Sequence, residues 1–238
     1  MRNNPHKITA CLDMYFRGIS LRKIQEHLQA FTPHNASHMT ILRWIRKYCN
    51  MIAKFTDSLK INNSKSITFD EMEFKTKGKR SFFIDVMDIR TRYMLSSGYY
   101  MQRGYKELLE VLKKAKKKST NKTLNFYTDG LLVYPRILKN VYSYRKGRGF
   151  YHKVIASKDN SFNWKIKRLH NSIRERTKTL RQFNTLHSAR AIMKGYEIFY
   201  NFCRKHQGIN AYPYELATDL KLGKNRWLDL IGLGSEKL

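Results

Sequence analysis

Three successive segments of this chain carry strand-like patterns of apolar residues, and together they constrain the fold more than any other feature. The segments cover residues 66–74, 82–88 and 93–100, and only short polar connections separate them. Gly78 lies in the first connection and Thr91 in the second. Strands joined by such short connections pair antiparallel. The sequence therefore predicts an antiparallel meander of three strands.

After the meander, the predicted elements alternate between helices and strands and then become helical. They are a helix over residues 104–118, a strand over 123–128, a short helix over 131–138, a strand near 141–144, a long helix from about 161, a helix over about 185–205 and a short helical region from about 213. A meander followed by such alternation is typical of an α/β fold. We therefore predict a mixed five-stranded sheet with flanking helices.

Residues 1–50 predict a separate all-α head of three short helices. Ser20 and Ser37 are each placed to cap a helix N-terminus, because their hydroxyl oxygens can accept hydrogen bonds from free backbone N–H groups. The third helix has an apolar face, and its opposite face carries His38, Thr40, Arg43, Arg46 and Lys47. This pattern is typical of a helix-turn-helix unit whose third helix enters the DNA major groove. The alternative is a plain three-helix cap with a solvated charged face.

The remaining segments predict the domain boundaries. Residues 51–65 contain few apolar side chains and are expected to be a linker between the head and the core. Residues 66–217 form the predicted core. Residues 218–238 are expected to form a C-terminal tail.

The excess of basic residues limits the class of partner. The chain contains 47 Lys and Arg residues and only 18 Asp and Glu residues, which gives a formal net charge of +29. Such a charge repels itself in a compact fold, and a polyanionic partner offsets that repulsion. Nucleic acid is favoured, because the charge spreads through folded segments and is not confined to a tail. A basic protein without a partner, a ribosomal protein and a membrane-surface protein are the alternatives.

The sequence gives little support to membrane, disulfide or zinc classes. No apolar run approaches the roughly 20 residues that a membrane-spanning helix needs. Cys11, Cys49 and Cys203 lie far apart, and no Cys-x-x-Cys pair is present. We therefore expect a soluble protein with three reduced thiols, located in the cytoplasm and associated with the nucleoid.

Two acidic residues stand at strand-like segments of this otherwise basic chain. Asp70 lies in the first strand of the predicted meander, and Asp129 directly follows the strand over 123–128. Strands of one sheet can bring such side chains together, so the pair is a candidate metal site. The simpler interpretation of Asp129-Gly130 is an ordinary turn between a strand and a helix, where this dipeptide is common.

Several stretches resemble, in their order along the chain, the DDE transposases of bacterial and archaeal insertion sequences, most closely the insertion-sequence-six type. The matching stretches are 18–24, 40–45, Asp70-Glu71, 86–88, Tyr127-Thr128-Asp129-Gly130, 168–178 and 200–206. Each motif is weak alone, but their ordered combination is specific. The resemblance implies a helix-turn-helix head and an RNase H-like catalytic core. It also implies that the natural partner is the inverted-repeat end of the protein's own element.

The resemblance further implies a metal site. In such cores three carboxylates hold two divalent cations, which support an in-line displacement at phosphorus. By this similarity Asp70 and Asp129 take the first two positions, and their oxygen ligands suit Mg²⁺ or Mn²⁺. Glu71 and Asp88 also match family positions, where they are expected to support the ligands.

The third carboxylate position departs from the family pattern. The glutamate that the resemblance places directly before Arg168 is Lys167 in this chain. A protonated lysine cannot bind a cation, and its charge repels one. Glu175 and Asp159 are the nearest acids, but neither is expected to take its place. We therefore hypothesise an intact transposase fold that binds DNA and cleaves it poorly or not at all.

Three functions remain open from the sequence: a DDE transposase, a catalytically inactive DNA-binding protein derived from one, and a helix-turn-helix regulator with a ligand-binding core. Joining two DNA ends generally requires two active sites, so a homodimer or larger assembly on DNA is expected. The residues expected to contact DNA are Arg22, Ser37, His38, Thr40, Arg43, Arg46 and Lys47 in the head, and Arg168, His170 and Arg174 on the long helix.

Overall fold

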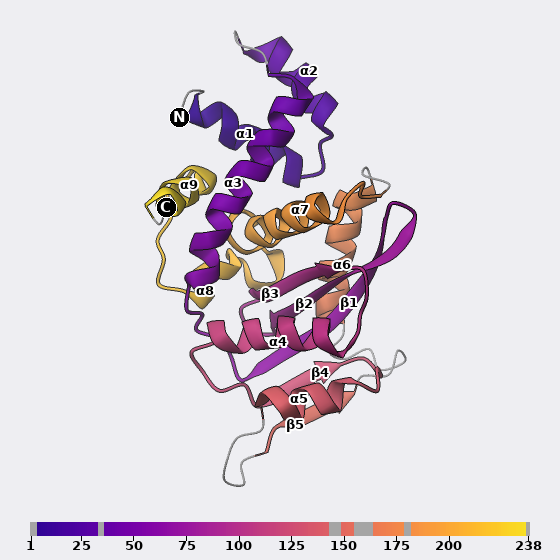
Figure 1. The fold of residues 1–238 in the computed structure, drawn as a ribbon. Helices are drawn as coiled ribbons and strands as arrows, with labels where there is room; N and C mark the ends of the chain where they lie inside the picture. Colours follow the sequence, from indigo (N-terminus) through magenta and orange to yellow (C-terminus); the bar gives the residue numbers. More distant parts are fainter. Residues whose placement is uncertain (1–3, 33–35, 143–148, 155–163, 179–181, 237–238) are drawn as a thin grey trace.

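The computed structural model describes residues 4–32, 36–142, 149–154, 164–178 and 182–236, and its centre is a five-stranded sheet (Figure 1). The strands are β1 (Ser66–Thr76), β2 (Lys79–Asp88), β3 (Met94–Tyr100), β4 (Asn125–Thr128) and β5 (Tyr151–Val154). Their order across the sheet is β3-β2-β1-β4-β5. The first three strands pair antiparallel, whereas β4 runs parallel to β1 and β5 runs parallel to β4. The predicted α/β fold with a mixed five-stranded sheet is confirmed.

The meander forms where its local sequence favours it. β2 lies between two other strands and is buried on both faces over most of its length, which explains its nearly continuous apolar pattern. The β1–β2 hairpin closes at Lys77 and Gly78, whose φ angles are 49° and 75°. Positive φ at both positions is the pattern of a type I′ hairpin loop, and glycine adopts such angles without steric strain.

Helices cover both faces of the sheet. The core helices are α4 (Tyr105–Lys118), α5 (Tyr134–Tyr142), α6 (Trp164–Thr177) and α7 (Leu186–Ile198), and α7 continues into a π-helical turn over Phe199–Cys203.

Two neighbouring serines in β3 show which face each helix covers. The Ser96 hydroxyl donates to a backbone carbonyl in α4 at 2.8 Å, and the Ser97 hydroxyl donates to Glu197 of α7 at 2.5 Å. Successive strand residues point to opposite faces. The helices α4 and α7 therefore lie on opposite faces of the sheet.

The strand predicted near residues 141–144 is wrong. Val141 and Tyr142 are the last residues of α5, and residues 143–144 lie outside the described part of the chain. The buried residues of α5 are Tyr134, Ile137, Leu138, Val141 and Tyr142. These residues recur at the spacing of one helix face. The short apolar run at the end of this helix was mistaken for a strand, because periodicity alone does not distinguish the two over so few residues. The fifth strand is β5, beyond the predicted position.

The head contains the three predicted helices: α1 (Pro5–Phe16), α2 (Leu21–Phe31) and α3 (His38–Ser58). Both predicted caps are present. The Ser20 hydroxyl oxygen accepts from the backbone N–H of Lys23 at 3.3 Å, and that of Ser37 accepts from Thr40 at 3.2 Å.

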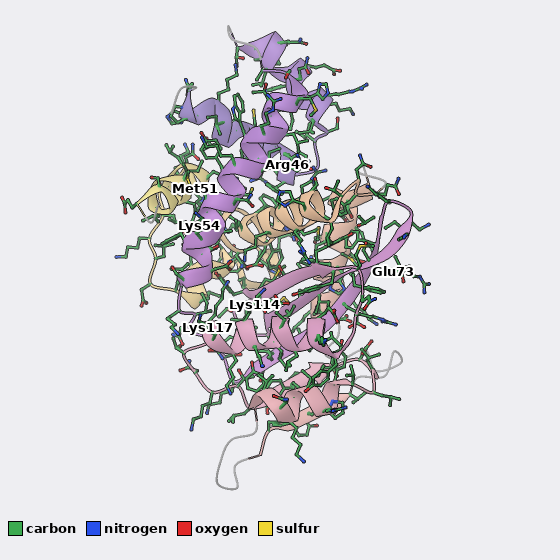
Figure 2. All side chains as sticks on the ribbon, viewed as in Figure 1. Arg46, Met51, Lys54, Glu73, Lys114 and Lys117 are labelled. Carbon is green, nitrogen blue, oxygen red and sulfur yellow. The ribbon has the colours of Figure 1, made fainter. Side chains whose placement is uncertain are left out.

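The linker predicted over residues 51–65 is largely helix, because α3 continues to Ser58. Met51 and Lys54 both lie on this continuation (Figure 2). Its side chains Ile52 and Phe55 are buried, so packing extends the helix into the core. The predicted boundary at residue 50 therefore falls inside one element that joins head and core.

Charged side chains hold the end of α3 against the core; Lys118 and Glu197 are buried, whereas Asp57 is about half exposed. Asp57 accepts from Lys118 of α4 at 2.7 Å and from Lys194 of α7 at 2.6 Å. Lys194 also pairs with Glu197 at 2.7 Å. Breaking one partner of such a network leaves an uncompensated charge, so the network favours a single docking of α3 on the core.

The C-terminal region is folded, contrary to the predicted tail over 218–238. It forms α9 (Arg226–Ser235), which follows the short α8 (Pro213–Ala217) and packs on α1 and α3 (Figure 1). A Cβ on Gly234 would lie only 3.2 Å from the backbone oxygen of Met51, so α9 and α3 approach closely there. The missed signal was the apolar content of this segment.

Replacing Trp227 with alanine should destabilise the protein by about 3–5 kcal/mol, the usual loss for a buried Trp. Trp227 is 3% exposed, stacks on Phe16 at a centroid distance of 5.6 Å and donates from Nε1 to Asp13 at 3.3 Å. Urea unfolding followed by circular dichroism measures the change. Glu236→Ala, at an exposed position, is the control and should change stability by less than about 0.5 kcal/mol. Equal stability of both variants would contradict a docked α9.

Two smaller expectations concern the cysteines and the membrane. Cys11, Cys49 and Cys203 are buried and free. In the described part of the chain, no helix is both long and apolar enough to cross a membrane.

Candidate functional site

Two neighbouring strands bring Asp70 and Asp129 together. Asp70 lies in the middle of β1, and Asp129 follows the last residue of β4. These strands are parallel, with Thr68 in register with Tyr127, so both acids stand two residues beyond a paired position. Ligand atoms of Asp70, Glu71 and Asp129 all lie within 4.8 Å of one another. The carboxylates that the sequence pairs across 58 intervening residues thus form one cluster.

Backbone N–H groups orient the two aspartates. Oδ1 of Asp70 accepts from the N–H of Glu71 at 2.9 Å, and Oδ1 of Asp129 accepts from the N–H of Leu131 at 3.0 Å. The second contact is the local turn expected for Asp129-Gly130. The turn and the candidate metal site are therefore compatible interpretations of the same residues.

Burial makes the Asp70 carboxyl a weaker acid than an exposed aspartate. Loss of solvent around it raises its pKa to about 7, with His170 opposing this rise and Asp85 adding to it. The side chain is 14% exposed. An ionised carboxylate in such surroundings gains more from a nearby cation than an exposed one does, because the local dielectric is low.

Glu71 reaches the cluster from the other face of β1. Its Oε1 accepts from Arg103 at 2.7 Å and its Oε2 accepts from the Tyr134 hydroxyl, and its side chain is only 3% exposed. Both oxygens are thus occupied. This arrangement fits the supporting role predicted for Glu71 better than that of a primary ligand.

Asp88, the other predicted supporting acid, closes a turn. Its carboxylate accepts from the backbone and hydroxyl of Ser64 at 2.7 and 2.6 Å, and from those of Thr91 at 2.9 and 2.8 Å. It pairs with Ile67 in the sheet, three residues from Asp70. Its contacts therefore stabilise the fold at a distance from the carboxylate cluster.

The helix α6 lies beside β1 and carries four of the predicted site residues (Figure 1). Lys167, Arg168 and Arg174 are exposed. His170 is buried, and its Nε2 forms a hydrogen bond of 2.7 Å with Asp85, so the predicted approach of His170 to a DNA phosphate is wrong for this conformation. The error arose because His170 shares a helix stripe with polar residues that point to solvent.

The position of Lys167 follows from that of His170, whose Nδ1 lies 3.8 Å from Oδ2 of Asp70. Lys167 precedes it by three residues, about 4.5 Å along the helix and on a neighbouring face. The other end of α6 lies toward the head, where Arg176 covers the Tyr15 ring at 3.8 Å. Going from His170 to Lys167 therefore leads away from the head.

Glu175 and Asp159 are the two acids that could replace the third carboxylate, and the structure places neither of them in the carboxylate cluster. Glu175 is exposed on α6, five residues beyond His170 toward the head. Asp159 lies outside the described residues.

The predicted DNA-contacting residues of the head fall into two groups. Arg22, Arg43 and Lys47 are exposed on α2 and α3. The others are tied to neighbours. The Ser37 and Thr40 hydroxyls lie 3.0 Å apart, and the His38 backbone N–H donates to Gln25 at 2.9 Å. These contacts fix the start of α3, the end that a recognition helix presents to bases.

Arg46 differs from the other head residues predicted to contact DNA, because its side chain is hydrogen-bonded to the core. It is half-buried and donates from Nη2 to the Ser188 hydroxyl of α7 at 2.9 Å. Arg46 therefore faces the core, because α3 continues past the predicted boundary and α7 packs against this part of it.

Sequence reasoning missed three residues near the cluster: Asp85, Arg103 and Tyr134. Asp85 could have been found, because it is a charged residue inside the apolar strand over 82–88, and buried charges are rare unless paired. Arg103 and Tyr134 gave no comparable signal, since exposed arginines and buried tyrosines are common.

The donor set suits a hard divalent cation. Asp70 and Asp129 offer carboxylate oxygens, which Mg²⁺ and Mn²⁺ prefer, and no cysteine or histidine belongs to the cluster of described residues.

Comparison with known proteins agrees with this architecture. Residues 64–206 match the family model of the DDE domain of IS240-type transposases. No curated protein matches the chain. A chain in the cryo-EM structure of the simian T-cell lymphotropic virus intasome, in complex with PP2A regulatory subunit B56 gamma, is 11% identical, with a TM-score of 0.50 over 86% of this chain and 81% of that one.

A second similar structure is the HTLV-2 integrase catalytic core domain in complex with magnesium, which is 11% identical with a TM-score of 0.46 over 66% of this chain and 98% of that one. At such identities the similarity concerns the fold alone. That fold is the RNase H-like core of integrases, preceded here by a helical region.

Proposed function

This chain belongs to the DDE transposases of the IS240 type, and from that premise we propose that it binds the terminal inverted repeats of its own insertion sequence and cuts and joins DNA there. One observation carries the proposal. Asp70 and Asp129 come from neighbouring parallel strands, and their ligand oxygens lie within 4.8 Å of each other.

Asp70 and Asp129 would hold Mg²⁺ or Mn²⁺. A pair of such cations, once bound, would supply activation of the attacking oxygen and stabilisation of the leaving oxygen in an in-line displacement at phosphorus. The chain itself supplies orientation and a water-poor setting. Backbone N–H groups fix both aspartates, and burial around Asp70 strengthens every charge interaction there.

The proposed DNA surface combines the head and α6. Arg43 and Lys47 would enter or flank the major groove from α3, and Arg22 would contact phosphate from α2. Arg168 and Arg174 stand exposed on α6, the helix that lies beside Asp70, and would hold the DNA strand near the cluster. Arginine suits this role because its planar guanidinium binds phosphate with two hydrogen bonds.

Lys167 limits the proposed chemistry. It stands on α6 one turn before the residue that contacts Asp70, where the family pattern has a glutamate. The exposed ammonium there favours a second function as the alternative: a transposase-derived protein that occupies inverted repeats without cutting them. Both functions share the same DNA surface and differ only in chemistry.

The reaction also bears on assembly and location. Joining two DNA ends requires two active sites, so we propose that the protein acts as a dimer or larger assembly on DNA. Its substrate places it with the nucleoid in the cytoplasm.

Mn²⁺ binding, followed by the electron paramagnetic resonance signal of free Mn²⁺, tests the metal site. Asp70→Asn and Asp129→Asn should each weaken binding by more than the roughly 10–100-fold that loss of an outer partner costs. Glu175→Gln, on the exposed part of α6, is the control and should bind as the native chain does. All three variants should retain gel-shift binding to inverted-repeat DNA. Unchanged Mn²⁺ affinity in both aspartate variants would overturn the proposed site.

A further inference from the structure

A buried ion pair lies on the α6 side of the sheet, beside the candidate metal ligand. Asp85 of β2 is 0% exposed, and His170 of α6 is 5% exposed. His170 Nε2 and Asp85 Oδ1 are 2.7 Å apart. Charged groups removed from water are tolerated when they are paired and hydrogen-bonded. Loss of either side chain would therefore leave the other buried without its hydrogen-bond partner.

The pair lies next to Asp70, on the same face of the sheet. Asp70 and Asp85 are direct partners in the antiparallel β1–β2 register, so both side chains leave the sheet on the same face. The His170 ring sits against both, with Nδ1 3.8 Å from Oδ2 of Asp70. Each ring nitrogen of His170 therefore faces a carboxylate oxygen, Nε2 that of Asp85 and Nδ1 that of Asp70.

The two oxygens of Asp70 are held differently. Oδ1 has a backbone donor, the N–H of Glu71, whereas Oδ2 faces the ring of His170. Carboxylates that bind metals are oriented by the groups around them, and loss of such a group weakens metal binding.

We propose that His170 is a positioning residue for the metal ligand Asp70, and that Asp85 holds the His170 ring in the required orientation. The inference rests on the proposed function, since it assigns Asp70 to the cation. It extends that function by giving a role to two residues outside the carboxylate cluster.

Asp85 is not itself the missing third ligand. Its Oδ1 is occupied by His170, and it does not belong to the cluster of ligand atoms found among the described residues. Its Oδ2 is buried and has no partner in the described part of the chain. Asp85 therefore acts through His170.

The double variant Asp85→Asn/His170→Gln tests the proposal. The glutamine amide can donate to the asparagine oxygen, which replaces the buried ion pair with a neutral hydrogen bond and preserves the packing. No ring nitrogen then faces Asp70. The melting temperature should stay within a few degrees of the native value, and the affinity for Mn²⁺ should fall about 10–100-fold. Binding to inverted-repeat DNA should not change.

A purely structural pair would give another result. In that case the double variant would recover both the melting temperature and the native Mn²⁺ affinity, and the proposal would be overturned. If the double variant does not fold, Asp85→Asn alone decides: weaker Mn²⁺ binding supports the proposal, and native affinity overturns it. A different result would overturn the proposed function, and this inference with it: the native protein binds no Mn²⁺, or it binds Mn²⁺ with an affinity that Asp70→Asn does not change.

Discussion

The Lys167→Glu variant should carry out strand transfer with Mn²⁺ at least about 100-fold faster than the native chain. Loss of a single electrostatic contact to a developing charge commonly lowers a rate by about 10²–10³-fold, and the substitution restores such a contact. The expected products are joined inverted-repeat and target strands, resolved on a denaturing gel. The native chain should give little product under the same conditions.

The geometry of α6 explains why one residue should matter this much. His170 of α6 lies 3.8 Å from Asp70, and Lys167 precedes His170 by about one helical turn. A glutamate at that point would add a third carboxylate to two already within 4.8 Å. The lysine instead puts a positive charge on the turn of α6 that precedes His170.

Lys167→Gln separates the two effects of the substitution. It removes the repelling charge but adds no anionic ligand, so it should gain much less activity than Lys167→Glu. Glu175→Lys is the control for charge on α6 and should leave activity at the native level. Robust and equal strand transfer by the native chain and Lys167→Glu would contradict an impaired site.

The meander and the positions of its acids could be predicted because short-range patterns determine them. Alternating apolar residues and a tight turn at Gly78 define the strands within a few residues. Asp70 and Asp129 stood out as acids at strand-like segments of a basic chain. Their convergence then follows from the parallel register of β1 and β4.

Long-range packing determined what the sequence did not reveal. The helix α3 crosses the predicted boundary because Ile52 and Phe55 are buried against parts of the chain distant in sequence. The same docking turns Arg46 toward Ser188 of α7. His170 was assigned to the DNA surface because its burial depends on Asp85, whose role appears only once β2 lies beside β1.

Binding to inverted-repeat DNA should weaken about 10³–10⁵-fold between 50 and 200 mM salt, the loss expected when 6–10 phosphates are neutralised. The formal charge of +29, with exposed Arg22, Arg43 and Lys47 on the head, supports a contact count of this size. Fluorescence anisotropy over a salt series gives the slope of log affinity against log salt, at about 0.9 per phosphate. A nearly salt-independent affinity would contradict this electrostatic account.

Two arginines of α3 provide a matched pair for that measurement. Arg43 is exposed, whereas Arg46 is half-buried and bonded to Ser188 at 2.9 Å. If Arg43 contacts phosphate, Arg43→Ala should lower the slope by about 0.9 and weaken binding to every sequence. If it reads a base, the slope should stay nearly constant and the preference for the inverted repeat should fall by about 1–3 kcal/mol. Arg46→Ala should change neither quantity, because its side chain is directed at the core; a lower slope for Arg46→Ala than for Arg43→Ala would show that α3 presents its other face to DNA.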